Sequence, residues 1–183
     1  MNAVFLDRDG TIVVDKGYIT IPDDVTLLPG AAEAIVRLRG AGLKVFVVSN
    51  QAGVAKGLLS EEELTGINQR MLMMLGAEGA LLDGIYCCPH HPEGSEPDYA
   101  VECACRKPKP GLLEQAAAEH GLDFSECAIV GDSARDVQAG RAAGVSATVL
   151  VLTGHGGEES QKEHGADFVA ADLTGAVAWL LSR

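Results

Sequence analysis

Short apolar runs rich in Val, Ile, Leu and Ala alternate with helical patterns along nearly the whole chain. The runs typical of strands are Ala3–Leu6, Lys44–Asn50, Gly84–Cys88, 127–132, 147–152 and a short one within 167–171. The helical patterns cover 31–42, a segment after residue 60, 111–121, 133–143 and the C-terminal tail. Strands separated by helices favour a parallel sheet with helices on both faces. The predicted fold class is therefore α/β, a doubly wound parallel sheet.

The size and charge of the chain narrow the classes of protein to which it can belong. With 183 residues, of which 47% are hydrophobic and only 4% aromatic, it can bury a substantial core of aliphatic side chains. We expect residues 1–183 to form one domain. The formal net charge of −12 argues against a nucleic-acid or anionic-membrane surface, although a local site can still bind an anion.

The chain shows no targeting or membrane signal that we recognise. Its first residues, MNAVFLDRDG, become acidic too early for a signal peptide, and no apolar stretch reaches the length of a membrane span. We therefore expect a cytoplasmic protein. We also expect it to be a monomer. Thiols stay reduced in that compartment, so clustered cysteines favour a metal site over disulfides.

Two pairs of carboxylates follow predicted strands. Asp7 and Asp9 come directly after the first strand, and side chains two apart on an extended backbone point the same way. Asp132 ends the fourth strand pattern, and Asp136 falls in the first turn of the next helix. Each of them alone is as readily a turn or helix-cap residue. Together, at neighbouring strand ends, they predict a Mg²⁺ site.

Groups that can bind anionic oxygens stand at two further places. Ser49 and Asn50 end the second strand pattern, and both can donate hydrogen bonds. Arg106 and Lys107 lie in the segment RKPKPG, just before a predicted helix. Basic residues in a loop are often simply solvated, but a cationic pair that leads into a helix start also suits a phosphate group.

The segment from Cys87 to Pro110 holds four of the five cysteines and two of the five histidines. Cys88 and His90 form a C-x-H pair, and Cys103 and Cys105 form a C-x-C pair. Three thiolates and one imidazole make a closed tetrahedral Zn²⁺ set, which is structural because no coordination position stays open. Such an ion would fix the loop, at about 87–110, and direct the basic pair that follows it. The spare candidate ligands are Cys87 and His91.

The motifs that follow the predicted strands occur in a definite order. They are DRDGT at 7–11, a hydroxyl residue after the second strand, KPKP at 107–110 and GDSARD at 131–136. This set resembles the haloacid dehalogenase (HAD) superfamily of phosphohydrolases. The resemblance implies a HAD-like phosphatase domain whose reaction proceeds through an aspartyl-phosphate.

The resemblance also implies roles for individual residues. Asp7 would attack phosphorus, and Asp9 would protonate the leaving alkoxide and then activate water. Mg²⁺ would be held by the Asp7 carboxylate, the Asp9 backbone carbonyl and Asp132. Ser49 and Lys107 would hold the phosphoryl oxygens.

The length of the loop between the two zinc-ligand pairs narrows the resemblance to particular phosphatases of this superfamily. Twelve residues separate His90 from Cys103. This length is similar to that in bacterial phosphatases that remove the C7 phosphate of D-glycero-D-manno-heptose 1,7-bisphosphate, on the route to nucleotide-activated heptose. The related histidinol-phosphate phosphatases have a much shorter loop and are the alternative. The heptose enzymes imply substrate contacts from Asp15, Lys16, Gly17, Tyr18, Asn50, Gln51, Ala52, Arg106, Lys107 and Ser133.

Three other classes of function account for only part of the sequence. Too few residues lie between Gly10 and Gly30 for a cap domain, so we expect an open site, which a protein substrate could also enter. A receiver-like phosphoacceptor uses acidic clusters and a lysine on a similar sheet. It lacks a carboxylate two residues after a first-strand nucleophile, so Asp9 favours a phosphatase. A zinc-binding interaction module would leave Asp7 and Asp132 unexplained.

Overall fold

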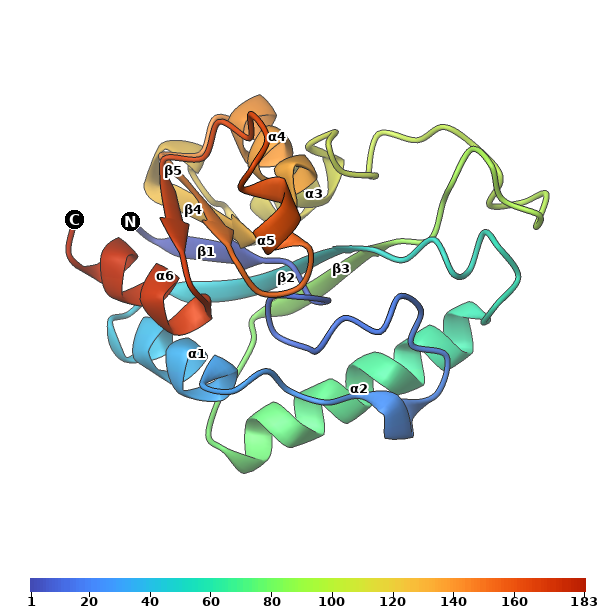
Figure 1. The fold of residues 1–183 in the computed structure, drawn as a ribbon, viewed down its shortest axis with the longest axis horizontal. Coiled ribbons are helices and arrows are strands. Elements are labelled where there is room, and N and C mark those ends of the chain that lie inside the picture. The colour runs from blue at the N-terminus through green and yellow to red at the C-terminus, as the bar shows by residue number, and fades with distance from the viewer.

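The fold is built around one parallel sheet. The computed structural model describes residues 1–183, and its sheet has six strands in the order β3-β2-β1-β4-β5-β6 (Figure 1). The strands are β1 (Ala3–Leu6), β2 (Lys44–Asn50), β3 (Gly84–Cys88), β4 (Cys127–Gly131), β5 (Ala147–Val151) and β6 (Phe168–Ala170). Every neighbouring pair is parallel. The prediction of a doubly wound α/β sheet is confirmed.

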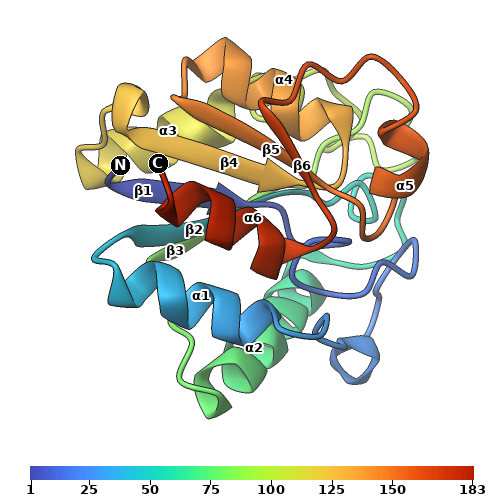
Figure 2. The same cartoon turned by 60° about the vertical axis from the view of Figure 1, so that its left-hand side comes forward.

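Helices cover both faces of the sheet, as the turned view in Figure 2 shows. On one face lie α1 (Ala31–Gly40), α2 (Glu61–Ala77) and α6 (Leu173–Leu181). On the other lie α3 (Gly111–His120) and α4 (Ala134–Ala143). Alternate residues of β1 enter the two cores, with Leu6 on the first face and Phe5 on the second. Because both faces are buried, the middle residues of the central strands form continuous apolar runs, such as Val45–Val48 in β2.

Local capping sets the helix boundaries. α2 begins after Ser60, whose hydroxyl accepts from the Glu63 N–H while the Glu63 carboxylate accepts from the Ser60 N–H. α1 ends at Gly40, earlier than predicted, because the chain turns at Gly42, where φ is 83°. Three short helices were not predicted, since elements of this length carry no hydrophobic periodicity: η1 (Pro22–Asp24), η2 (Phe124–Glu126) and α5 (Gly156–Glu159). None of the helices combines the length and the apolar character that a bilayer crossing requires.

Strand register brings the ends of β1, β2 and β4 into line. Leu6 pairs with Val47 in β2 and with Val130 in β4. The polar residues that follow these strands therefore emerge at one edge, the carboxyl end of the sheet. The loops after β1, β2 and β3 extend beyond the sheet on that same side (Figure 1).

Candidate active site

A pocket of about 270 Å³ opens at the carboxyl end of the sheet. Its wall is polar and is formed by residues that follow β1, β2, β3, β4 and β5. Every residue predicted to be catalytic, to bind substrate or to bind Mg²⁺ lines this pocket, except Lys16. The Lys16 Nζ instead donates to the backbone oxygen of Asp24 at 2.7 Å. The fold thus brings together motifs that are far apart in the sequence.

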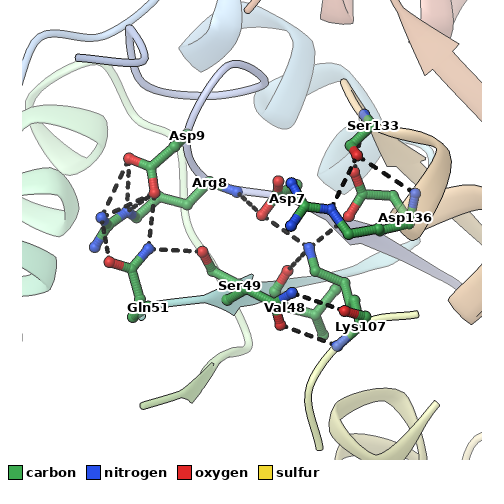
Figure 3. A network of polar contacts seen from close by, with 11 residues as sticks. Asp7, Arg8, Asp9, Val48, Ser49, Gln51, Lys107, Ser133 and Asp136 are labelled. Atoms are coloured by element: carbon green, nitrogen blue, oxygen red, sulfur yellow. Dashed lines mark hydrogen bonds and ion pairs between the residues drawn. The ribbon is translucent and has the colours of Figure 1, made fainter. Parts of the chain in front are cut away.

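Lys107 is the buried cation at the centre of the site (Figure 3). Its Nζ lies 2.9 Å from Asp7 Oδ1 and 2.5 Å from Asp136 Oδ1, and it donates to Val48 O at 2.7 Å. Burial opposes the charge, but the two carboxylates outweigh burial and raise the pKa of Lys107 above its usual value. The ammonium therefore stays charged beside Asp7.

The loop that carries Lys107 is fixed to the end of β2. The Asn50 Nδ2 donates to Lys107 O at 2.9 Å, and the Lys107 N–H donates to Asn50 Oδ1 at 3.0 Å. Ser49, at the same strand end, is buried and lines the pocket, where its Oγ accepts from Gln51 Nε2 at 2.8 Å. The predicted phosphoryl-binding pair, Ser49 and Lys107, therefore shares one wall of the pocket.

Asp132 and Asp136 form an acidic cluster with Asp7. One oxygen from each of the three carboxylates lies within 4.8 Å of the others. Burial, followed by the charge of Asp7, raises the pKa of Asp132 to about 8. A cation between these carboxylates would relieve that penalty, and hard oxygen donors suit Mg²⁺. Asp136 also has two other partners: its Oδ1 bonds to Lys107, and its Oδ2 accepts from the Ser133 N–H at 3.1 Å.

Two glycines make room for Asp132. At Gly10 (φ 78°) and at Gly154 (φ 57°), an added Cβ atom would stand 2.1 Å from Asp132 Oδ2. The His155 N–H donates to the same oxygen at 2.8 Å. Positive φ and close approach both require glycine at these two positions. Thr153 Oγ1 donates to Gly10 O, which joins the two loops that enclose Asp132.

Asp9 has a separate set of partners (Figure 3). The Arg8 Nε lies 3.2 and 3.1 Å from its two carboxylate oxygens, and Gln51 Nε2 donates to Asp9 Oδ2 at 2.7 Å. Burial raises the pKa of the Asp9 carboxyl, although the Arg8 charge opposes this. The expectation of parallel Asp7 and Asp9 side chains assumed an extended backbone, whereas β1 ends at Leu6 and the chain turns after it.

The predicted zinc ligands Cys88, His90, Cys103 and Cys105 form a second cluster, at the end of β3 and in the loop after it. The three Sγ atoms are 3.1 to 3.5 Å apart, and His90 Nδ1 lies 3.7 Å from Cys88 Sγ and 3.4 Å from Cys105 Sγ. A tetrahedral ion with bonds of about 2.0–2.3 Å holds its donors roughly 3.5 Å apart, so these side chains fit zinc. The other sulfur and imidazole candidates lie outside the cluster: Cys87, His91 and Cys127.

Arg135 and His155 line the pocket but were missed in the sequence. His155 Nε2 lies 2.9 Å from Asp15 Oδ2, which ties the loop after β5 to the loop after β1. Arg106 is anchored at the rim by a bond from its Nη1 to His90 O at 3.1 Å. Arg135 could have been found because it lies within GDSARD, whereas only the fold brings His155 to the pocket.

Comparison with known proteins identifies this arrangement. Residues 104–176 match the HAD-hydrolase-like family. A D-glycero-beta-D-manno-heptose-1,7-bisphosphate 7-phosphatase from Yersinia pestis is 41% identical over 178 residues, which are 96% of this chain and 94% of the relative. The chain belongs to this phosphatase family. A member from Photorhabdus laumondii is 43% identical over 152 residues, or 83% of this chain and 81% of the relative.

A solved structure of the heptose bisphosphate phosphatase family agrees with this fold over its whole length. The D,D-heptose 1,7-bisphosphate phosphatase from B. bronchiseptica, crystallised with magnesium and phosphate, gives a TM-score of 0.88 at 36% identity. The match covers 100% of this chain and 99% of that one. The chain is therefore a phosphatase of the HAD type, as the order of its motifs predicted.

Proposed function

We propose that this chain, acting as one phosphatase domain, removes the C7 phosphate of D-glycero-D-manno-heptose 1,7-bisphosphate. The observation that carries the proposal is the Lys107 ammonium between Asp7 and Asp136, beside Asp132, at the floor of an open polar pocket. That arrangement suits attack on a phosphate monoester. The names of the relatives supply the sugar, and the pathway is the formation of nucleotide-activated heptose.

The reaction has two half-reactions. In the first, an Asp7 carboxylate oxygen attacks phosphorus, the bond from phosphorus to the sugar oxygen breaks, and Asp9 gives its proton to the leaving alkoxide. In the second, water attacks the aspartyl-phosphate, Asp9 takes the proton of that water, and phosphate leaves with Asp7 restored. Ser49 and Lys107 bind the phosphoryl oxygens in both steps.

The site would require one Mg²⁺, held by the Asp7 carboxylate, the Asp9 backbone carbonyl and Asp132. The ion would supply positive charge to the phosphoryl oxygens. Asp136 stays bonded to Lys107 and Ser133, which fits a role in orienting Lys107. The raised pKa of Asp132 supports this assignment, because the unfavourable buried charge is what a divalent cation would compensate.

The loop after β3 would be held by one structural Zn²⁺ on Cys88, His90, Cys103 and Cys105. Arg106 follows the last ligand in sequence and also bonds to the backbone of His90. Its half-buried guanidinium lines the pocket. Zinc binding would therefore fix the direction of Arg106 at the rim.

Hydrolysis of a substrate panel tests the proposed function. The panel contains heptose 1,7-bisphosphate, histidinol phosphate and 4-nitrophenyl phosphate, each with Mg²⁺. We expect the heptose bisphosphate to give a kcat/KM at least roughly tenfold above the others, and ³¹P spectra to retain the anomeric phosphate while the C7 phosphate disappears. Faster hydrolysis of histidinol phosphate would establish the alternative substrate. Stoichiometric phosphorylation without turnover would instead indicate a phosphoacceptor.

Arg106 provides a test of where the second phosphate binds. Arg106→Ala should lower kcat/KM for the heptose bisphosphate by about ten- to a hundredfold, because one charge-assisted contact is worth roughly 1.5–3 kcal/mol. Hydrolysis of 4-nitrophenyl phosphate, which has no second phosphate, should change little. Lys109→Ala is the matched control, since Lys109 is an exposed cation of the same loop outside the pocket. Equal losses for both substrates in the Arg106 variant would exclude the rim-phosphate role.

A further inference from the structure

Arg8 is a buried cation that the reaction scheme leaves without a role. It is 1% exposed and does not line the pocket, although it stands between the nucleophile and the acid/base in sequence. Its guanidinium faces Asp9 through Nε and Nη2, and Nη2 also donates to Gln51 Oε1 at 2.9 Å. The salt bridge from Nη2 to Asp9 Oδ2 is 2.9 Å. The Asp9 carboxylate is thus held by Arg8, which lies outside the pocket, and by Gln51, which lines it.

The third nitrogen of this guanidinium, Nη1, bonds to a side chain of α2. Nη1 donates to Asn68 Oδ1 at 2.9 Å, across 60 positions of sequence. The Asn68 amide is itself fixed, since its Nδ2 donates to Cys87 Sγ at 3.5 Å on β3. Asn68 also faces a separate groove of about 450 Å³, which it lines with Cys87 and Leu64. It does not line the catalytic pocket, so it has no direct route to the substrate.

We propose that Asn68 is a positioning residue for the acid/base, acting through Arg8. The Arg8 guanidinium donates to Asp9 from Nε and Nη2, and to Asn68 from Nη1. Asn68 therefore supplies the acceptor for the one terminal nitrogen that does not bond to Asp9. This inference rests on the proposed role of Asp9 as general acid. It adds that the position of the Asp9 carboxyl depends on a side chain from α2 that touches neither substrate nor metal.

Loss of the Asn68 amide would release Arg8 in a predictable way. Nη1 would become a buried donor without a partner, which is costly, so the guanidinium would turn to find another acceptor. The Asp9 carboxylate would move with it, because it bonds to the same guanidinium. A general acid must lie within hydrogen-bond reach of the leaving oxygen, and a displacement of about 1 Å can cost as much as a hundredfold in rate.

The dependence of the rate on the leaving group separates this role from general support of the fold. A sugar alkoxide needs a proton as it leaves, whereas 4-nitrophenolate leaves without one. Asn68→Ala should therefore lower kcat/KM for the heptose bisphosphate by roughly ten- to a hundredfold and for 4-nitrophenyl phosphate by less than about threefold. The quantity to compare is kcat/KM, because kcat also contains the second half-reaction, which is common to both substrates.

Two further variants complete the experiment. Gln69→Ala removes a neighbouring exposed amide on α2 and should leave both substrates unaffected. Asn68→Asp keeps an acceptor oxygen for Arg8 and should recover most of the lost kcat/KM for the sugar substrate. Equal losses for the two substrates in Asn68→Ala, or no recovery in Asn68→Asp, would overturn the positioning role.

Asp9→Asn distinguishes failure of this inference from failure of the proposed function. If Asp9 is the general acid, this variant must show the same selective loss for the sugar substrate, and a larger one. A selective loss in Asp9→Asn without any in Asn68→Ala would refute only the role of Asn68. Absence of a selective loss in Asp9→Asn would refute the proposed role of Asp9 itself.

Discussion

Replacement of Asp7 by asparagine is expected to abolish turnover and to leave the fold intact. The amide cannot form an acyl-phosphate, and it brings no charge to the metal. The contacts that Asp7 makes should survive, because an asparagine Oδ1 can still accept from the Arg8 N–H and from Lys107, which are 2.8 and 2.9 Å from the present carboxylate oxygen. Lys107 also keeps Asp136 as a charged partner. Phosphate release below about one thousandth of the wild-type rate is the expected measurement.

Acid-quench labelling with a radioactive aryl phosphate gives the control for the Asp7 variant. The wild-type chain should show a transient acid-stable label, and Asp7→Asn should show none. Asp9→Asn should still accept the label from this substrate, since 4-nitrophenolate leaves unaided, but should lose it slowly. Near-normal turnover by Asp7→Asn, with circular dichroism unchanged, would rule out Asp7 as the nucleophile.

Replacement of Cys103 or Cys105 by serine should release one zinc per chain and unfold the loop after β3. Structural zinc in small peptides binds with roughly 10–16 kcal/mol, and whole domains are stable by only about 5–15 kcal/mol. Even part of that binding energy is a large share of the stability. Elemental analysis and thermal unfolding of protein purified without chelator measure the two effects.

Cys87 is the matched control for the zinc prediction. It lies next to the proposed ligand Cys88 in β3, yet its thiol contacts Asn68 and stands outside the cluster. Cys87→Ser should retain zinc and most of the thermal stability. The zinc assignment fails if wild-type protein contains no zinc, or if the Cys87 variant loses as much of it as the Cys103 variant.

The strands could be predicted from the sequence because both faces of the sheet are covered. Their residues are mostly apolar, so each of the long strands begins and ends within a residue of its prediction. The polar residues at the strand ends were equally visible, since Asp7, Ser49 and Asp132 follow such runs directly. Parallel pairing in register then places them at one edge.

Contacts between distant segments were not predictable in the same way. Asn68 is an ordinary polar residue of an amphipathic helix, and nothing near it in sequence indicates that it meets Arg8. His155 lies in a loop without a motif, and reaches the pocket because the loop after β5 packs on Gly10. Lys16 stays a prediction, since in this structure its Nζ bonds to the backbone oxygen of Asp24 and does not line the pocket.

The floor of the pocket is formed by strand ends and its rim by loops. This division affects how the substrate specificity of such an enzyme can change. Asp7, Ser49 and Asp132 are placed by the register of β1, β2 and β4, which insertions in distant loops leave untouched. Asp15, Arg106 and His155 belong to three loops, and the side chains of Asp15 and His155 bond to each other across two of them. Lengthening or exchanging these loops would therefore redirect the enzyme to other phosphate esters while the phosphorus chemistry persists. For a designer, the rim is the part to randomise and the strand ends are the part to keep.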